Sequence, residues 1–225
     1  MIGGMPHAPV LTIASPDGRT PLVFNWGVSS LFGWGLYGLN LMLELADHPR
    51  YVPMCAIEIE PAQLVLDPVR QARLAPVVDG SRRLWQGMAA IRGGQAALNV
   101  PYLAGLGTQL GSGASAHGRT LTGQPTIGVV FLEHDKLDRD AIERARQMAV
   151  IIAGSSWNEA VLRNNGITSV TRVLQGVDTS LFHPAPKADL FPGRFVVFSG
   201  GKLERRKGQD IVLAVFRAFH QRHPE

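Results

Sequence analysis

The 225-residue chain is 45% hydrophobic and 18% charged, a balance that excludes a disordered protein and is typical of a folded globular one. Its 22 basic and 18 acidic residues give a net charge of +4, too small an excess to indicate a nucleic-acid partner. The single cysteine, Cys55, cannot form an internal disulfide. Because nothing points to an oxidising compartment, we expect a cytoplasmic protein.

The first informative stretch is the uncharged run between Arg19 and Glu44. It is long enough to cross a membrane, but glycine, serine and asparagine residues interrupt it and Pro21 stands at its start. We therefore expect a strand over 22–26, a glycine-containing loop and a buried helix over 36–46.

Strand-like and helix-like patterns alternate along most of the remaining chain. Strands are expected over 52–59, 97–103, 126–132, 150–153 and 169–174, and helices over 69–91, 138–148 and 156–165. This alternation predicts an α/β fold with a parallel sheet flanked by helices. Ser156, with Glu159 three residues later, is the predicted N-cap of the last of these helices. The glycine-rich segment 105–123 is expected to be a mobile loop that contains no regular element.

Basic side chains dominate the stretch from Asp67 to Arg119, which contains six arginines and only two acids: Arg70, Arg73, Arg82, Arg83, Arg92 and Arg119 against Asp67 and Asp79. The pattern has two interpretations, a solvated face or a surface that contacts an anionic partner such as a membrane.

The proline-rich stretch 184–193 has the composition of a linker. It would separate a first domain, 1–183, from residues 194–225. The latter are far fewer than the roughly 100 residues that such a domain needs, so we expect the second domain to be truncated. The pattern after the linker predicts a strand over Phe195–Phe198, a glycine-rich turn and a helix.

That turn combines features suited to an anion. Gly201, Lys202, Lys207 and Gly208 precede a helix, whose N-terminus offers free backbone N–H groups and the positive end of its dipole. The lysine ammonium groups add positive charge. The turn therefore indicates a site for a diphosphate, although a solvated basic loop has the same composition.

A second glycine motif lies near the start of the chain. Residues 33–38 match the dinucleotide fingerprint G-x-G-x-x-G, and Glu58 follows Gly38 by twenty residues at the end of a strand-like run. The fingerprint places its first glycine directly after the strand, whereas residues 27–32 intervene here. Binding of NAD or a flavin, and a glycine loop with another role, both stay open.

Three motifs together resemble the retaining glycosyltransferases of the GT-B fold, and more closely the family-four group that includes sucrose synthases and bacterial mannosyltransferases. They are the segment Ala153–Glu159, the G-V-D-x-x-x-F-x-P string that ends at Pro184, and the turn from Gly201 to Gly208. The resemblance covers roughly residues 150–215. It implies a Rossmann-like acceptor-side domain and the start of a nucleotide-sugar-binding domain.

The resemblance also implies an activity, the transfer of a hexosyl group from a nucleotide-diphosphate sugar to a hydroxyl acceptor, with retention and without a metal or other cofactor. The acceptor would be a glycan, a lipid-linked sugar or a small molecule, and the arginine-rich face would make peripheral contact with the inner face of the membrane. Lys202, Lys207 and Gly201 would bind the donor diphosphate, and the loop Gly33, Trp34 and Gly35 would lie near its phosphates.

Catalytic candidates come from a predicted strand end. Glu133 and His134 follow the expected strand 126–132, and the carboxyl ends of parallel strands face the ligand crevice. His117, in the glycine-rich segment, is expected to meet the acceptor. No acidic pair stands in a context typical of a metal site.

The family's paired glutamates of the second domain do not occur before Glu225, so we expect little or no transferase activity from this chain alone. A dinucleotide-dependent oxidoreductase and a non-catalytic, glycosyltransferase-like binding protein are the alternatives.

Overall fold

The computed structural model describes residues 8–91, 94–113, 115–186, 188 and 190–224. The chain divides into two compact units, Met1–Gly176 and Val177–Glu225. Each is described by itself.

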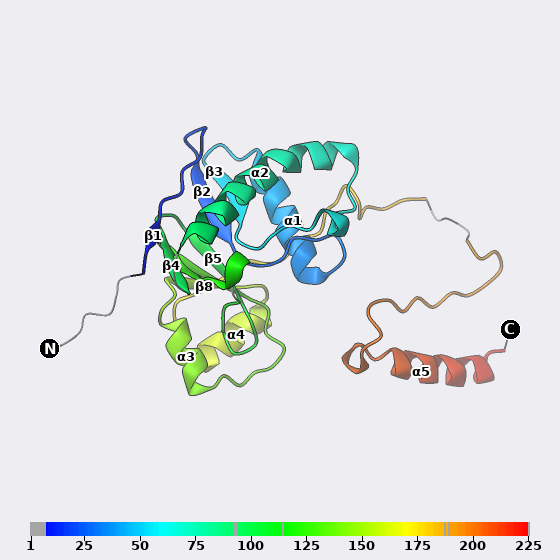
Figure 1. Ribbon diagram of the computed structural model, residues 1–225. Coiled ribbons are helices and arrows are strands. Elements are labelled where there is room, and N and C mark those ends of the chain that lie inside the picture. Colours follow the sequence, from blue (N-terminus) through cyan, green and yellow to red (C-terminus); the bar gives the residue numbers. More distant parts are fainter. Residues whose placement is uncertain (1–7, 92–93, 114, 187, 189, 225) are drawn as a thin grey trace. The chain divides into compact units, whose positions relative to one another are not determined.

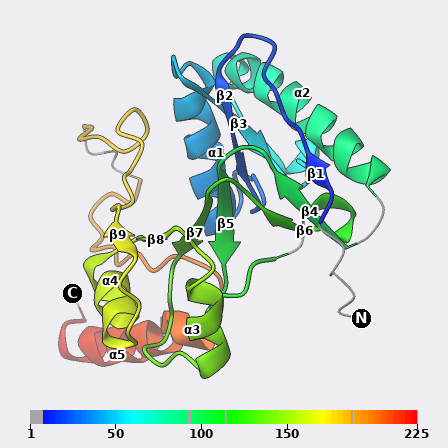
Figure 2. The same cartoon turned by 90° about the vertical axis from the view of Figure 1, so that its left-hand side faces the viewer.

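The first unit is an α/β structure built on parallel sheets (Figures 1 and 2). Its strands are β1 (Val10–Leu11), β2 (Thr20–Phe24), β3 (Tyr51–Cys55), β4 (Gln95–Leu98), β5 (Tyr102–Leu106), β6 (Thr120–Thr122), β7 (Thr126–Val130), β8 (Val150–Ala153) and β9 (Val170–Arg172). Its α-helices are α1 (Gly33–Ala46), α2 (Pro68–Ala90), α3 (Arg139–Ala145) and α4 (Ser156–Asn164), and two short 3₁₀ turns are η1 (Pro61–Gln63) and η2 (Ala116–Gly118).

The main sheet has six strands in the order β3-β2-β5-β7-β8-β9, and a smaller sheet has the order β1-β4-β6. Every pair in both sheets is parallel. The predicted α/β fold with a parallel sheet and flanking helices is therefore confirmed.

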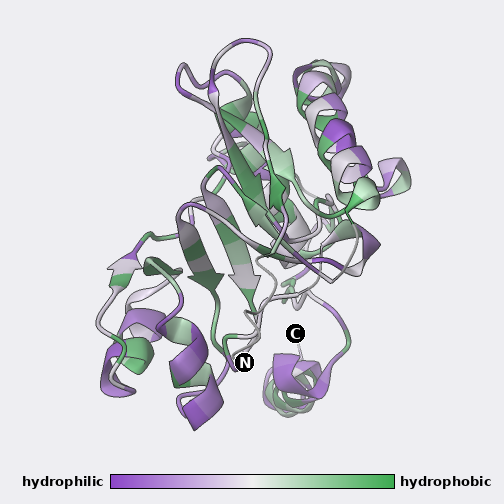
Figure 3. Cartoon of the chain, turned by 60° about the vertical axis from the view of Figure 1, so that its left-hand side comes forward, coloured by the Kyte–Doolittle hydropathy of each residue, from purple (hydrophilic) through white to green (hydrophobic). Residues whose placement is uncertain are grey.

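The core lies on both faces of the six-stranded sheet, because successive side chains of a strand point to opposite faces. Val23 and Val130 pack in one buried cluster, whereas their neighbours Phe24 and Val129 pack in the other. The first cluster includes residues of α3, α4 and the smaller sheet, and the second includes the buried side of α1. Figure 3 shows the result as strands of mainly hydrophobic colour and helices with hydrophilic surfaces.

Helix α2 packs along β3, one of the two edge strands of the main sheet. Its first half contributes Leu74 and Val77 to the α1 side of the sheet, and its second half contributes Leu84 and Met88 to the opposite side. The strand at this edge, β3, contains Pro53, and an edge strand tolerates proline because one of its sides needs no backbone donor.

The expectation of one strand over 97–103 is wrong. The stretch forms two strands, β4 and β5, in different sheets. Pro101 has no backbone N–H to donate, and Asn99 turns aside to bond Ile13, whose backbone N lies 2.7 Å from Asn99 Oδ1. The apolar run therefore breaks between these strands.

Two local expectations also need correction. The N-cap of α4 is Ser155, whose Oγ accepts a hydrogen bond from the Asn158 backbone N at 3.1 Å, and Ser156 is the first helical residue. The segment 105–123 is not free of regular elements, since its described residues include η2 and β6. Leu110 and Ala116 of this segment are buried in the core.

The second unit contains the short turn η3 (Arg205–Lys207) and the helix α5 (Gln209–Arg222), as the pattern of turn and helix predicted. The expected strand over Phe195–Phe198 is not formed, because no other segment described in this unit pairs with it. None of the unit's described residues is buried, and Phe195 and Phe198 are exposed.

Within the described ranges, no helix is both long and apolar enough to cross a membrane. The uncharged run after Arg19 forms β2, a loop and α1 instead, as expected.

Candidate functional site

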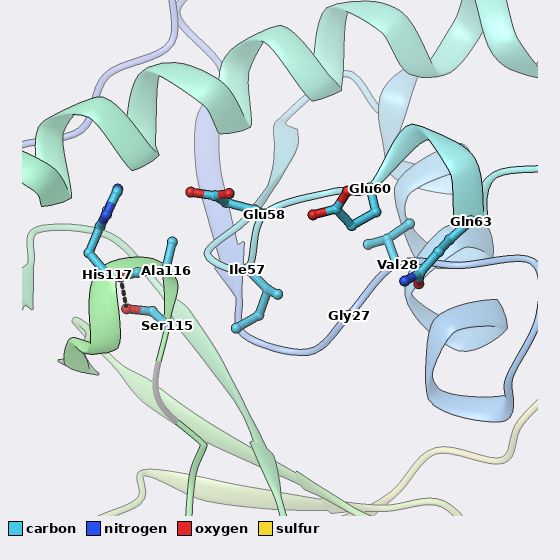
Figure 4. A pocket seen from close by; sticks show the side chains of 9 residues that line it. All are labelled: Gly27, Val28, Ile57, Glu58, Glu60, Gln63, Ser115, Ala116 and His117. Carbon is cyan, nitrogen blue, oxygen red and sulfur yellow. Dashed lines mark hydrogen bonds between the residues drawn. The ribbon is translucent and has the colours of Figure 1, made fainter.

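A pocket of about 490 Å³ lies beyond the carboxyl ends of the strands of the main sheet. It is lined by the residues Gly27, Val28, Ile57, Glu58, Glu60, Gln63, Ser115, Ala116 and His117 (Figure 4). These residues follow β2, follow β3, or lie between β5 and β6. The chain leaves β2 for β3 on one side, whereas β5 lies on the other side of β2, so this is a topological switch point of the sheet. Open parallel sheets bind their ligands at such points.

Hydrogen bonds tie the walls of the pocket together. The Ala56 backbone N donates to the Phe24 carbonyl at 2.7 Å, and the Ala116 N donates to the Ala56 carbonyl at 2.7 Å. The Ser30 N and Oγ donate to the Gln63 carbonyl at 2.9 and 3.0 Å. The segments after β2 and β3 and the turn η2 are therefore held in place before any ligand arrives.

Asn25, directly after β2, fixes the glycine-rich segment. It is buried, its Oδ1 accepts from the Gly105 N at 2.7 Å, and its Nδ2 donates to the Gly113 carbonyl at 2.8 Å and to Ser112 Oγ at 3.0 Å. The side-chain amide of Asn25 thus joins the end of β5 to the loop that carries the turn η2. No local pattern in the sequence marks this residue, because its partners lie 80 to 88 residues further along the chain.

His117 lines this pocket from the turn η2. Its φ angle of 59° is in the left-handed region, which non-glycine residues seldom occupy and which is enriched at functional sites. The turn is secured because the Ser115 N donates to the Arg119 carbonyl at 2.8 Å. The residue expected to meet an acceptor is therefore presented on a fixed turn.

Glu58 and Glu60 bring two carboxylates to the same pocket. In the view of Figure 4, the carboxylate of Glu58 lies between the ring of His117 and the carboxylate of Glu60. Both glutamates are exposed, and neither side chain has a hydrogen-bond or ion-pair partner in the described part of the chain. Glu58 stands out in the sequence by its position after a strand. Glu60 and Gln63 follow the same strand but are not among the residues that the sequence predicted for a site.

The glycines of residues 33–38 have partners within the chain. A Cβ on Gly35 would lie 2.6 Å from Ser29 Cβ and 2.9 Å from the Ser29 backbone N, and a Cβ on Gly38 would lie 2.8 Å from Trp26 Nε1. These two glycines therefore let α1 pack against the loop that precedes it. Gly33 begins α1, and a Cβ added there would meet nothing within 4 Å. None of the three glycines lines the pocket.

Trp34 belongs to an aromatic cluster at the start of α1. Its ring centroid lies 4.7 Å from Phe131 and 5.5 Å from Trp26 in tilted or edge-on geometry. Such pairs stabilise the packing of α1 against the end of β7. Trp34 is half-buried and does not line the pocket.

Glu133 and His134 follow β7 as expected, but neither lines the pocket. His134 Nε2 lies 2.9 Å from Gln109 Nε2. Gln109 Oε1 accepts from the Asp138 backbone N at 3.0 Å, so its Nε2 is the donor and His134 Nε2 accepts. This contact gives His134 a role in joining two loops. Glu133 is exposed.

Two glycines with positive φ angles and one side-chain hydrogen bond shape the lysine-containing turn of the second unit. Gly201 has a φ of 111° and Gly208, the N-cap of α5, has a φ of 68°. The side chain of Gln209 donates to the Lys202 carbonyl at 3.0 Å and closes the turn. Lys202 and Lys207 are both exposed.

The charge of this turn is positive overall. Four basic residues, Lys202, Arg205, Arg206 and Lys207, stand against Glu204 and Asp210. Arg206 pairs with Glu204 at 2.9 Å, and Asp210 lies in the first turn of α5. Lys202, Arg205 and Lys207 have no ion-pair partner among the described residues, and they lie beside the N-terminus of a 14-residue helix.

The arginines of residues 67–119 do not form one free basic face. Arg70, Arg73 and Arg82 of α2 pair with Asp67, Asp47 and Asp79. Arg119 is half-buried and donates to the Ile91 carbonyl at 2.7 Å. Arg83 is exposed, and Arg92 lies outside the described residues. The pairs formed by Arg70, Arg73 and Arg82 fit the first of the two interpretations of this stretch, a solvated charged face.

The described residues contain no group of three or more His, Cys, Asp or Glu that could hold a metal ion. Cys55 is buried, and burial raises the pKa of its thiol to about 12, so the reactive thiolate is not available near neutral pH.

The chain matches no family model, and comparisons with curated proteins and with solved structures found nothing similar to it.

Proposed function

We propose that this chain carries the acceptor-side unit and the donor-diphosphate turn of a GT-B glycosyltransferase. The first unit, Rossmann-like in its parallel sheet, would hold a hydroxyl acceptor in the pocket at its switch point. The second unit would hold the diphosphate of a nucleotide sugar. Retention and metal independence are expected from the resemblance of the motifs.

The turn from Gly201 to Gly208 is the observation that carries this proposal. It places two exposed lysines at the start of α5, and two left-handed glycines shape its backbone. As the bond to the sugar breaks, negative charge develops on the leaving nucleoside diphosphate. Fixed cations and helix N–H groups stabilise that charge most where they are already in place.

Equilibrium binding to nucleoside diphosphates tests the proposal directly. Isothermal titration of the full chain with UDP and GDP is expected to show binding of at least one of them. Lys202→Ala and Lys207→Ala are each expected to weaken it by about tenfold, since a charge-assisted hydrogen bond contributes about 1.5–3 kcal/mol. Arg222→Ala, which removes an equal charge at the far end of α5, is the matched control.

Failure of both diphosphates to bind would contradict the proposal. Equal affinities for the wild type and the two lysine variants would also contradict it, because the phosphates would then lie elsewhere.

An NAD-dependent oxidoreductase is the second candidate, because Glu58 follows β3 and lines the pocket, where a ribose-binding acid would stand. The close approach of Ser29 to Gly35 argues against this candidate, because the second glycine of the fingerprint is the one that a pyrophosphate approaches. Quenching of tryptophan fluorescence by NADH but not by UDP or GDP would favour it instead.

A further inference from the structure

We infer that the pocket beside η2 takes a hydroxylated ligand that carries a positively charged amino group, such as an amino sugar. The inference deepens the proposed function, since in that setting the ligand is the acceptor. The binding itself requires only the pocket.

The charge of the pocket is the first reason. Among the nine lining residues, Glu58 and Glu60 are acids and none is a lysine or arginine. The two carboxylates have no ion-pair partner in the described ranges, although the chain as a whole has a net charge of +4. A cationic ligand would supply the missing partner, whereas a phosphorylated one would be repelled.

Hydrogen-bonding capacity points the same way. Ionised carboxylates only accept hydrogen bonds, so a ligand at Glu58 and Glu60 must donate. Ammonium and hydroxyl groups donate, and phosphate oxygens do not. Gln63, whose side chain also has no partner among the described residues, can both donate and accept. Hydroxyl groups of a sugar match that combination.

The size and rigidity of the pocket also suit a small ligand. The volume of about 490 Å³ is within the range of about 300–1,000 Å³ typical of small-molecule pockets. The walls are already joined by the bonds from Ala116 to Ala56 and from Ser30 to Gln63. Ordering them around a ligand would therefore cost little free energy.

The test compares three sugars that differ in charge: glucosamine, glucose and glucose 6-phosphate. Binding to the full chain is followed by protein-observed NMR near neutral pH, where the amine is protonated. We expect glucosamine to bind tightest and glucose 6-phosphate weakest, with signals of Glu58, Glu60 and His117 shifting. Glu58→Gln with Glu60→Gln should weaken glucosamine binding by about tenfold and leave glucose little changed.

Glu44→Gln is the matched control, because Glu44 is an exposed carboxylate on α1 that does not line the pocket. N-acetylglucosamine, which lacks the positive charge, should bind no better than glucose. Equal binding of glucosamine and glucose, tighter binding of glucose 6-phosphate, or no shift at the pocket signals would each overturn the inference.

The two proposals fail separately. If glucosamine binds no better than glucose while UDP or GDP still binds at the lysine turn, only the inference about the pocket is wrong. If glucosamine is preferred at the pocket while neither UDP nor GDP binds at the lysine turn, only the proposed donor site is wrong.

Discussion

Single glycines show which of the two glycine motifs serves packing. Gly35 and Gly33 both belong to the first turn of α1, yet only Gly35 faces a backbone neighbour at close range. Gly201, in contrast, needs its glycine for a φ of 111°, and a Cβ there would meet only Gln209 Nε2 at 3.7 Å. The literal match to a dinucleotide fingerprint therefore has an explanation in packing.

Gly35→Ala should destabilise the first unit by about 1–3 kcal/mol, because the new Cβ would overlap Ser29 and force α1 and its loop apart. Gly33→Ala is the control, since it adds a methyl group in open space at a helix start. It should be neutral or stabilising by up to about 1 kcal/mol. Urea unfolding followed by circular dichroism measures both. Equal stability of the two variants would show that the loop yields and that the packing explanation is wrong.

At the scale of the element, most boundaries were predictable and the errors have local causes. The uncharged run predicted the positions of β2 and α1, and the helix over 69–91 appears as α2 with nearly the same limits. The strand over 97–103 failed because Asn99 and Pro101 interrupt it. The strand over 195–198 failed because a strand needs a neighbour, which hydrophobic pattern alone does not guarantee.

The cap of α4 provides a second test. Ser155→Ala should destabilise the chain by about 1 kcal/mol, because it leaves the Asn158 N–H without its acceptor. Ser156→Ala should change the stability little, since Ser156 is exposed and already helical. Thermal unfolding of both variants decides the matter. A larger loss for Ser156→Ala would restore the cap expected from the sequence.

At the scale of the whole molecule, the sequence predicted the α/β architecture but only part of the pocket. His117 and Glu58 carry local signals, a histidine in a glycine-rich segment and an acid after a strand. That both residues line one pocket depends on the strand order, which places β2 between β3 and β5. Glu133 and His134 carry the same strand-end signal, but the order of the strands puts β7 further from the switch point.

The central claim is that a nucleoside diphosphate binds at the lysine turn. One measurement tests it most directly: ¹H–¹⁵N chemical-shift mapping of the full chain with UDP, GDP and NADH added in turn. The account predicts shifts of the amide signals of Gly201, Lys202, Lys207 and Gly208 with UDP or GDP, and none at these residues with NADH. Shifts at Gly33 to Gly35 and Glu58 with NADH, and an unchanged lysine turn, would contradict it and favour the oxidoreductase.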